Sequence, residues 1–578
     1  MAYPLDRTDN IYPESHHAQM SSGSKFSFRF VIPVILGVAF AFGDSVASDA
    51  GLLKLSNPSL YLRAIYFCLI FVAVFSICEI LLRKIFHAST SDELFLSKLD
   101  DRVSAKAQSP LFAVQLAFVI LLCWAVWIYL FRPGIYWSDT SQQLLEHFGK
   151  VTLSDHHPYL VTLIFGLFAD LGKTLFGSVS KGLYCLVLLQ CVSASYIFSA
   201  SLCYLIKNRA SLFICILVFL FVCLFPFIPL MFSSLAKDTI SAVFFMCFCL
   251  EFVKCINGDK SRKVVIFLYV SGLLCSLTKK TAAYVILLCL FLLVVFIFKK
   301  SLKKRVETGV TLTKWVGIFL SFAIFVFIFV PKIILPMLGV QAGGKQEAIA
   351  IPIQQVAHDV KFNGDRLSKQ DYSVINHFLL TDTKRIPDVY DWQIVDPVKQ
   401  RGLKDEKLMP AFMSIWFRNS FKLFKGHFEA WMGLVDGWFS FRIDQAGTPN
   451  YMVVLTYSGW HDEGIESVTD WNDQITNGGK ICEELYRAIQ SIPIVNLLFY
   501  RSFWASLFPA FVLFFIFGAF VKGERYRALL IFSPIFVSVL TLMIVPVSVM
   551  GGEPTRYLFA MICSSPFLFG VLLCRNVN

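Results

Sequence analysis

The chain of 578 residues is 56% hydrophobic and contains 59 phenylalanines, while only 16% of its residues are charged. This composition excludes a soluble globular protein and predicts a polytopic membrane protein. The net charge of +12 does not indicate a nucleic-acid partner, because lysine and arginine cluster between apolar segments, as in the run Lys299 to Arg305. Nearly all of the 16 cysteines lie inside apolar segments, so we expect no disulfide framework.

Apolar segments near the length that crosses a bilayer recur along the chain and predict an all-α fold with about 12 transmembrane helices. Residues 1–27 are polar and lack the features of a signal peptide, so we expect a cytoplasmic N-terminus. Residues 28–109 predict two spans followed by a charged cytoplasmic linker. The predicted spans lie near residues 28–45, 61–82, 110–131, 181–205, 211–232, 239–256, 264–277, 281–298, 314–337, 496–521, 528–549 and 557–574.

Residues 132–180 follow the third predicted span and predict an external loop. If the amphipathic stretch 158–176 were a full span, the basic run Lys299 to Arg305 would fall outside, against the rule that basic loops stay in the cytoplasm. We therefore expect two short interfacial helices in this loop. Residues 110–337 then form a transmembrane core.

Residues 338–495 separate the ninth and tenth predicted spans and are too long for a loop without structure. They predict a mixed external domain. Within it, residues 409–435 space aromatic side chains three and four apart with basic residues between them, which predicts an amphipathic helix pair or one long interfacial helix. Residues 496–578 predict three C-terminal spans, which leave the C-terminus in the cytoplasm.

Basic residues at the outer ends of the predicted spans are unexpected from topology alone, and they suggest an anionic ligand or lipid headgroups. These residues are Lys237, Lys279, Lys280 and Arg556. Simpler interpretations stay open. Lys237 and the neighbouring Asp238 could neutralise each other. Arg556 lies in a tight turn, where Glu553 is a candidate salt-bridge partner.

The predicted first external loop carries Asp139, Asp155, His156 and His157. Asp139 suits the role of a general base, and the other three suit contacts with a substrate or its phosphate. Both aspartates also suit helix capping, Asp139 for a helix that starts at Thr140. Either histidine with an aspartate would suit a divalent metal, but no ligand spacing of the HExxH type supports a metal centre.

Gln354 and Gln355 begin the external domain shortly after the ninth predicted span. Amide groups hydrogen-bond sugar hydroxyls, so these two residues are candidates for substrate binding. The alternative is an ordinary polar turn of a helix after Pro352.

Five motifs together resemble a known class of enzymes. PGIYWSDTSQQ, SDHHPYLVTLIFGL, SSLAKDT, IPIQQVAHDV and EPTRYLF are similar to motifs of an uncharacterised bacterial family of polytopic proteins grouped with the GT-C class of membrane glycosyltransferases. The similarity extends from about residue 110 to 574. The resemblance implies a GT-C-like core that takes a sugar from a polyprenyl-phosphate carrier and passes it to an acceptor on the outer side. It also implies that Asp139, in the first external loop, is the base.

We therefore expect a membrane glycosyltransferase of the bacterial cytoplasmic membrane, with an external active site. It would modify a cell-envelope glycan or related acceptor by direct displacement with inversion. Two alternatives stay open. An envelope polysaccharide polymerase or ligase with a lipid-diphosphate substrate would rely on external arginines more than on Asp139. A transporter would carry ionisable residues deep inside its spans, and residues 243–250 and 285–298 are nearly free of them.

Overall fold

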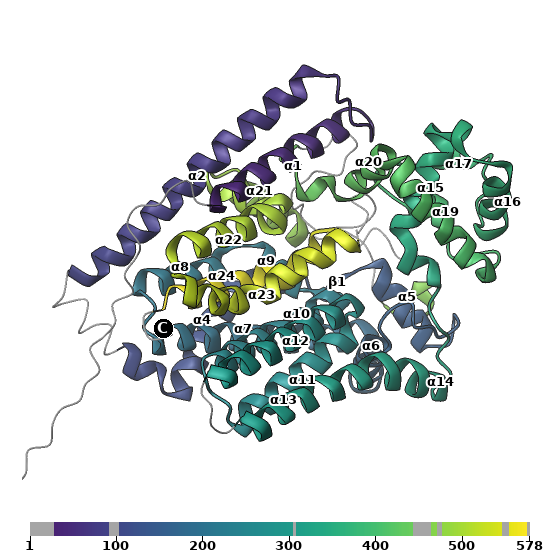
Figure 1. Ribbon diagram of the computed structural model, residues 1–578. Coiled ribbons are helices and arrows are strands. Elements are labelled where there is room, and N and C mark those ends of the chain that lie inside the picture. Colours follow the sequence, from purple (N-terminus) through teal and green to yellow (C-terminus); the bar gives the residue numbers. More distant parts are fainter. Residues whose placement is uncertain are drawn as a thin grey trace, which may run out of the picture.

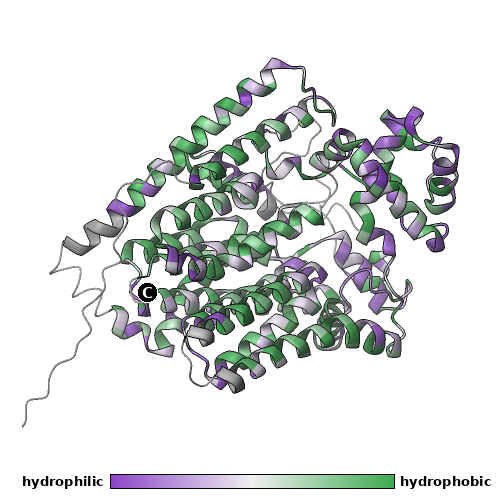
Figure 2. Ribbon diagram, viewed as in Figure 1, coloured by the Kyte–Doolittle hydropathy of each residue, from purple (hydrophilic) through white to green (hydrophobic). Residues whose placement is uncertain are grey.

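The computed structural model describes residues 28–91, 103–303, 308–442, 464–470, 477–545 and 554–574. Within these residues the chain is almost entirely helical. It forms a bundle of long apolar helices with a smaller helical unit beside one end (Figure 1). Figure 2 shows hydrophobic residues along the bundle helices and a larger share of hydrophilic residues in the smaller unit. The expected all-α fold is confirmed, while the predicted cytoplasmic segment 1–27 lies outside the described residues.

Ten helices in the described part of the chain are long and apolar enough to cross a membrane, which identifies a multi-pass membrane protein. They are η1 with α1 (Phe28–Phe30, Val31–Ser48), α2 (Pro58–Ser91), α4 (Pro110–Leu130), α6 (Tyr159–Phe176), α7 (Val179–Lys207), α10 (Lys237–Ile256), α12 (Lys280–Lys303), the continuous run of α13, η2 and α14 (Thr308–Ile324, Phe325–Ile334, Leu335–Met337), α23 (Lys522–Ile544), and η10 with α24 (Pro554–Leu558, Phe559–Leu572).

Three of the predicted spans correspond to shorter helices. The helices in these places are α8 (Leu212–Leu224) with α9 (Phe227–Phe232), α11 (Arg262–Thr278), and η9 (Phe503–Leu507) with α22 (Phe508–Ala519). α8 has only 13 residues because Pro226 disfavours helical backbone at Phe225, which is extended with a ψ of 104°. A proline that hydropathy does not register thus divides one apolar segment into two helices.

The position of α6 tests the expectation that residues 158–176 form an interfacial helix of the external loop. Length and composition count α6 among the ten helices, whereas the sequence predicts an interfacial helix there. His157, just before α6, contacts Lys237 at the start of α10. Ser178, just after α6, donates to the carboxylate of Asp470 and belongs to the turn that leads into α7. The residues that flank α6 therefore contact polar residues at both ends: Lys237, the first residue of α10, and Asp470, which follows η7.

The smaller unit contains most of the predicted external domain and has a hydrophobic core of its own, built around Ile353, Ile375, Phe378 and Phe412. Its described residues form helices and turns with one isolated bridge, Leu379 to Leu403, so the expected mixed character is not seen there. The elements between the ninth and tenth predicted spans are η3 (Lys345–Ile349), α15 (Ala350–Phe362), η4 (Gly364–Arg366), α16 (Lys369–Phe378), α17 (Ile386–Val389), α18 (Asp396–Lys399), η5 (Glu406–Leu408), α19 (Met409–Lys422), α20 (Phe424–Val435), η6 (Asp436–Trp438), η7 (Ile465–Ser467) and α21 (Asn477–Gln490), and η8 (Val495–Phe499) lies at the start of the tenth span.

The N-terminal hairpin of α1 and α2 is tied to this helical unit. The backbone N–H of Leu53, between the two helices, donates to Glu429 Oε1 at 2.5 Å. Ser440 Oγ donates to Asp44 Oδ1 at 2.6 Å. The two predicted N-terminal spans therefore pack as part of the whole molecule and hold the smaller unit against the bundle.

Candidate functional site

A short parallel ladder joins two loops at one end of the bundle. β1 (Ile135–Tyr136) pairs with β2 (Ser234–Leu235), with Ile135 opposite Ser234 and Tyr136 opposite Leu235. α5 (Ser138–His147) follows β1, and α10 follows β2. Because the strands are parallel, the two helices begin side by side at the same end of the ladder. The first turns of α5 and α10 carry Asp139 and Lys237.

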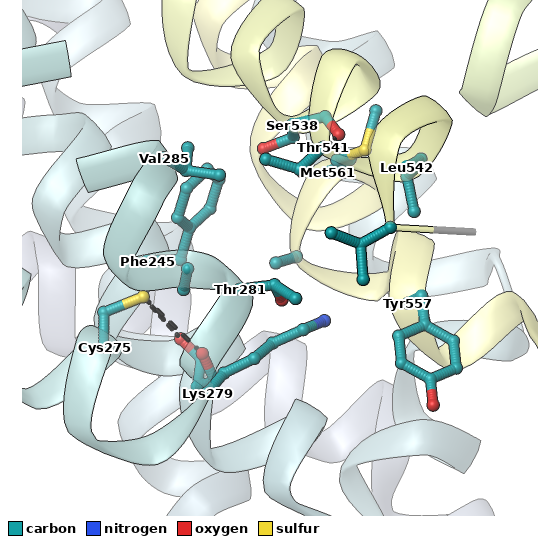
Figure 3. A pocket seen from close by; sticks show the side chains of 14 residues that line it. Phe245, Cys275, Lys279, Thr281, Val285, Ser538, Thr541, Leu542, Tyr557 and Met561 are labelled. Atoms are coloured by element: carbon teal, nitrogen blue, oxygen red, sulfur yellow. Dashed lines mark hydrogen bonds between the residues drawn. The ribbon is translucent and has the colours of Figure 1, made fainter. Parts of the chain in front are cut away.

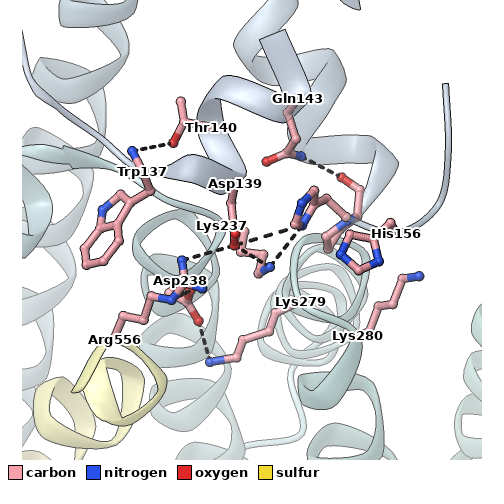
Figure 4. Close-up of polar contacts among 12 residues, drawn as sticks. Trp137, Asp139, Thr140, Gln143, His156, Lys237, Asp238, Lys279, Lys280 and Arg556 are labelled. Carbon is pink, nitrogen blue, oxygen red and sulfur yellow. Dashed lines mark hydrogen bonds and ion pairs between the residues drawn. The ribbon is translucent and has the colours of Figure 1, made fainter. Parts of the chain in front are cut away.

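Asp139 is the centre of a buried charge cluster (Figure 4). Its Oδ2 lies 2.6 Å from Lys237 Nζ, 3.1 Å from Arg556 Nη1 and 3.9 Å from His157 Nδ1. Lys237 Nζ also lies 3.2 Å from His157 Nδ1. These four residues come from α5, the loop before α6, α10 and η10. The structure thus brings together side chains that the sequence identifies separately.

The helix-cap interpretation of Asp139 does not describe the structure. α5 begins at Ser138, and Trp137 occupies the N-cap position. Asp139 lies in the first helical turn, where a negative charge is favourable, but its carboxylate faces Lys237 and Arg556 rather than a backbone N–H. Asp155 does not cap α6 either, since Pro158 occupies that N-cap position.

A second buried carboxylate completes the charge cluster. Asp238 Oδ1 lies 2.7 Å from Lys279 Nζ, and Asp238 Oδ2 lies 3.8 Å from Arg556 Nε. Arg556 therefore bridges Asp139 and Asp238, and the expected pair of Lys237 with Asp238 is replaced by partners from other helices. Glu553, the other expected partner of Arg556, lies outside the described residues. Three cations share two carboxylates, which leaves a surplus of one positive charge.

The electrostatics keep Asp139 ionised and His157 neutral. Burial alone would raise the pKa of Asp139, but the charges of Lys237 and Arg556 outweigh it and hold that pKa well below its usual range. Burial, reinforced by Lys237, lowers the pKa of His157 to about 3. A neutral imidazole keeps one nitrogen with a lone pair, so His157 is able to accept a hydrogen bond from Lys237 or from a ligand.

Asp155, His156 and Lys280 lie beside the cluster rather than in it. Lys280 Nζ pairs with Asp155 Oδ2 at 2.9 Å, and the Lys280 side chain is 47% exposed. The His156 ring packs edge-on against His157, with ring centroids 4.6 Å apart. Figure 4 shows Lys279 and Lys280 pointing in different directions although they are neighbours in the chain. These three residues form the more open edge of the site.

Gln354 and Gln355 do not reach the charge cluster. Gln354 Nε2 donates to the backbone oxygen of Asp391 at 2.6 Å. Gln355 Nε2 donates to the backbone oxygen of His427 at 2.8 Å, and Trp416 Nε1 donates to Gln355 Oε1. Both glutamines are buried on α15, and the hydrogen bonds above lie inside the helical unit. An amide side chain suits buried backbone groups as well as sugar hydroxyls, so their contact with a substrate stays a prediction.

A small, partly open and mainly apolar pocket adjoins the charge cluster (Figure 3). Its walls come from α10, α11, α12, α23 and α24, with Phe245, Val285, Leu542 and Met561 among the apolar side chains. Lys279, which pairs with Asp238, lies at its polar end together with Tyr557. The pocket therefore combines walls suited to a hydrocarbon with a cation suited to an acid group.

Two aromatic residues of the site are absent from the sequence-based candidates. The Arg556 guanidinium lies 5.1 Å from the ring centroids of both Trp137 and Tyr557, and Lys279 Nζ lies 5.2 Å from that of Tyr557. Trp137 precedes Asp139 by two residues, and Tyr557 follows Arg556 directly. Both residues lie inside the motifs that carry Asp139 and Arg556, and this position is the sequence signal that could have identified them as site residues.

The cluster suits an anion better than a metal ion. Among the described residues, no three His, Cys, Asp or Glu side chains converge as a metal site requires. Lys237 lies against both Asp139 and His157, and its ammonium group would repel a cation bound there. Any divalent ion would have to displace Lys237 first.

The comparisons with known proteins give a family but no activity. The model of a family of unknown function, DUF6020, matches residues 148–575, which is more than half of the chain. The matched range includes His157, Lys237, Lys279 and Arg556 and begins after Asp139. No curated protein and no solved structure matches the chain.

Proposed function

Because the chain belongs to DUF6020, a family of unknown function, we propose its activity from the site itself: a membrane glycosyltransferase of GT-C type that uses a polyprenyl-phosphate-linked sugar. The acceptor is a cell-envelope glycan or a related molecule on the outer face of the bacterial cytoplasmic membrane. One observation carries the proposal. The carboxylate of Asp139, in the first turn of α5, shares a buried cluster with Lys237 and Arg556 beside an apolar pocket.

The donor matches the pocket in two parts. A polyprenyl chain is a hydrocarbon that suits the apolar walls around Phe245 and Leu542. Its phosphate suits Lys279 and Arg556. Lys279 pairs with Asp238, and Arg556 contacts both Asp238 and Asp139. An incoming phosphate would compete with these carboxylates for the same cations.

That competition gives Asp139 its chemical role. When the phosphate draws Arg556 away, the carboxylate of Asp139 loses part of the charge that lowers its pKa and becomes a better base. Asp139 then takes the proton of the acceptor hydroxyl while that oxygen bonds the anomeric carbon. The bond between the anomeric carbon and the phosphate oxygen breaks on the opposite side, and the lipid phosphate leaves with its electron pair, stabilised by Lys279 and Arg556.

A second candidate is an envelope polysaccharide polymerase or ligase with a lipid-diphosphate substrate. The observation that favours it is Arg501, which is buried and donates from Nε to Thr555 Oγ1 at 3.1 Å, next to Arg556 in the chain. Two arginines near one another suit a diphosphate. This reaction would not depend on Asp139 as a base.

The test compares the cell-envelope glycans of strains that carry the wild type, a deletion, Asp139→Asn or Asp155→Asn, by mass. Asp155→Asn is the matched control, because it removes a loop carboxylate whose ion pair, among the described residues, is with the more exposed Lys280. We expect the deletion and Asp139→Asn to remove the same sugar-sized unit, and Asp155→Asn to retain it, with equal protein levels in the membrane.

The other outcomes separate the two candidates. If the deletion changes the glycan and Asp139→Asn does not, the base assignment is wrong and the polymerase or ligase gains support. If the deletion leaves every glycan unchanged, the glycosyltransferase proposal loses its foundation.

A further inference from the structure

The junction of α19 and α20 exposes a row of large aromatic side chains. Phe417, Phe421 and Phe424 are 61%, 73% and 69% exposed. Arg418, Lys422 and Lys425 alternate with them along the chain and are exposed as well. We call these six residues, from Phe417 to Lys425, the elbow patch. Three phenylalanines this exposed in one short segment are unusual for a surface that faces only water.

The patch is a consequence of how the two helices pack. Phe412, Ile415 and Asn419 form the buried face of α19, so residues 417 and 421, one turn apart, share the outer face. Their rings touch, with centroids 5.2 Å apart. Leu423 is buried between the two helices, which turns the start of α20 so that Phe424 also faces outward. The helical unit therefore holds the row in place while leaving it uncovered.

The patch is continuous with the surface of the bundle. Phe424 stacks on Phe428, with ring centroids 6.4 Å apart, and Phe428 packs edge-on against Phe42 in the C-terminal half of α1. One turn further along α20, Trp431 Nε1 donates to the backbone oxygen of Met543, at the end of α23, at 2.9 Å. The patch is thus connected to α1 and α23, two helices that are long enough to cross a membrane.

The charges of the patch favour an anionic partner. Arg418 pairs with Asp371, and Lys425 pairs with Glu429. Lys422 has no carboxylate partner among the described residues. Aromatic rings alternating with cations are typical of helices that lie in the interface of a bilayer with anionic headgroups.

We propose that the elbow patch is a membrane-docking surface, with Phe417, Phe421 and Phe424 inserted among the lipids and Lys422 against anionic headgroups. The occupant is the bilayer in which α1 and α23 reside. α20 then anchors the helical unit to the membrane surface, independently of any ligand in the charge cluster. This inference does not depend on the proposed transferase activity.

Photo-crosslinking in lipid nanodiscs tests the proposal directly. The full chain carries p-benzoylphenylalanine in place of Phe421, in nanodiscs of equal phosphatidylcholine and phosphatidylglycerol. Leu69, 66% exposed within α2, is the membrane control, and Leu380, 45% exposed after α16, is the control in the helical unit. We expect lipid adducts by mass at positions 421 and 69 and none at position 380. Phosphatidylglycerol should be enriched at position 421 relative to position 69, and Lys422→Gln should remove that enrichment.

The remaining outcomes overturn the proposal in distinguishable ways. Adducts at position 69 without adducts at 421 would mean that the patch faces water. A crosslink between two copies at position 421 would mean that the patch is a protein interface. Lipid adducts at 421 without enrichment of phosphatidylglycerol would retain the insertion of the rings and overturn the role of Lys422.

Discussion

Lys279 and Lys280 are neighbours in the chain and differ sharply in surroundings. Lys279 pairs with the fully buried Asp238 and lines the apolar pocket, whereas Lys280 pairs with Asp155 at the open edge of the site. The sequence identifies both as cations at the end of an apolar span. It does not tell them apart, because only the packing of α11 against α10 decides which one faces the pocket.

This difference predicts unequal effects of the same substitution. Lys279→Met should lower the amount of transferred sugar at least tenfold, since a charged hydrogen bond to a phosphate contributes about 1.5–3 kcal/mol. Lys280→Met should change it by less than about twofold, because an exposed ion pair contributes little. The measurement is the mass of the envelope glycan at matched protein levels.

A control separates a lost ligand contact from misfolding. Lys279→Met leaves Asp238 buried with only the more distant Arg556, so part of its effect would be structural. The double variant Lys279→Met with Asp238→Asn removes that buried charge. If the double variant restored both stability and sugar transfer, Lys279 would have no role in phosphate binding.

His157 gives a prediction about pH. Burial and Lys237 lower its pKa to about 3, whereas an unfolded histidine titrates near 6.5. The stability gained by keeping His157 neutral is therefore complete above pH 6.5 and is lost as the pH falls toward 3, at about 1.4 kcal/mol per pH unit. His157→Gln should flatten the fall of the thermal unfolding midpoint in detergent between pH 6.5 and 4.5. The same change at the exposed His377 should leave the slope as in the wild type.

At the scale of the elements, α6 and α7 approach one another through two glycines. A Cβ on Gly172 would lie 2.5 Å from Gly182 Cα, and a Cβ on Gly182 would collide with the backbone oxygen of Phe168. Neither obstacle is the movable end of a side chain, so the helices themselves would have to separate. The sequence contains both glycines but does not show that they meet, because that depends on the crossing of two helices.

Gly172→Ala should therefore destabilise the protein by about 1–3 kcal/mol, the usual cost of overpacking. Gly317 on α13 is the matched control, since a Cβ there meets nothing within 4 Å and alanine favours a helix. Thermal unfolding in detergent is the measurement. Equal midpoints for the two variants would contradict the close packing of α6 on α7.

The elements that hydropathy predicted best are the long apolar helices, such as α2, α10 and α12, whose existence follows from composition alone. Two kinds of feature could not be predicted in that way. Pro226 shortens α8 by a backbone effect that a hydropathy window averages out. The β1 to β2 ladder has two residues in each strand and is formed by loops about one hundred residues apart. Without that pairing, Asp139 and Lys237 remain two separate polar residues after apolar spans.

At the scale of the whole molecule, α10 begins in the charge cluster at Lys237 and ends at Ile256, shortly before Lys260. Because α10 is long enough to cross a membrane, the charge cluster and Lys260 should lie on opposite sides. From the parity of the spans expected in the sequence, we predict that the charge cluster and the helical unit lie on the outer side, and this orientation stays a prediction.

Cysteine labelling checks this orientation. All 16 native cysteines are buried or half-buried, so their background reaction with a membrane-impermeant maleimide should be low. Lys404→Cys, in the helical unit, should react in spheroplasts, and Lys260→Cys should react only after the membrane is permeabilised. Reaction of both from outside would contradict the topology.

The two-residue ladder of β1 and β2 also separates the site into two parts. One part is joined by backbone hydrogen bonds, and the other is joined to it through side chains. Backbone hydrogen bonds of the ladder join the start of α5 to the start of α10, so we expect Asp139 and Lys237 to move together. Arg556 comes from η10 and is joined to that body only through side chains. Separation of α24 from α10, which would widen the pocket for a bulky lipid, changes the distance from Arg556 to Asp139 and leaves Asp139 beside Lys237. Entry of the lipid would then change the electrostatic environment of the Asp139 carboxylate before any sugar is in place.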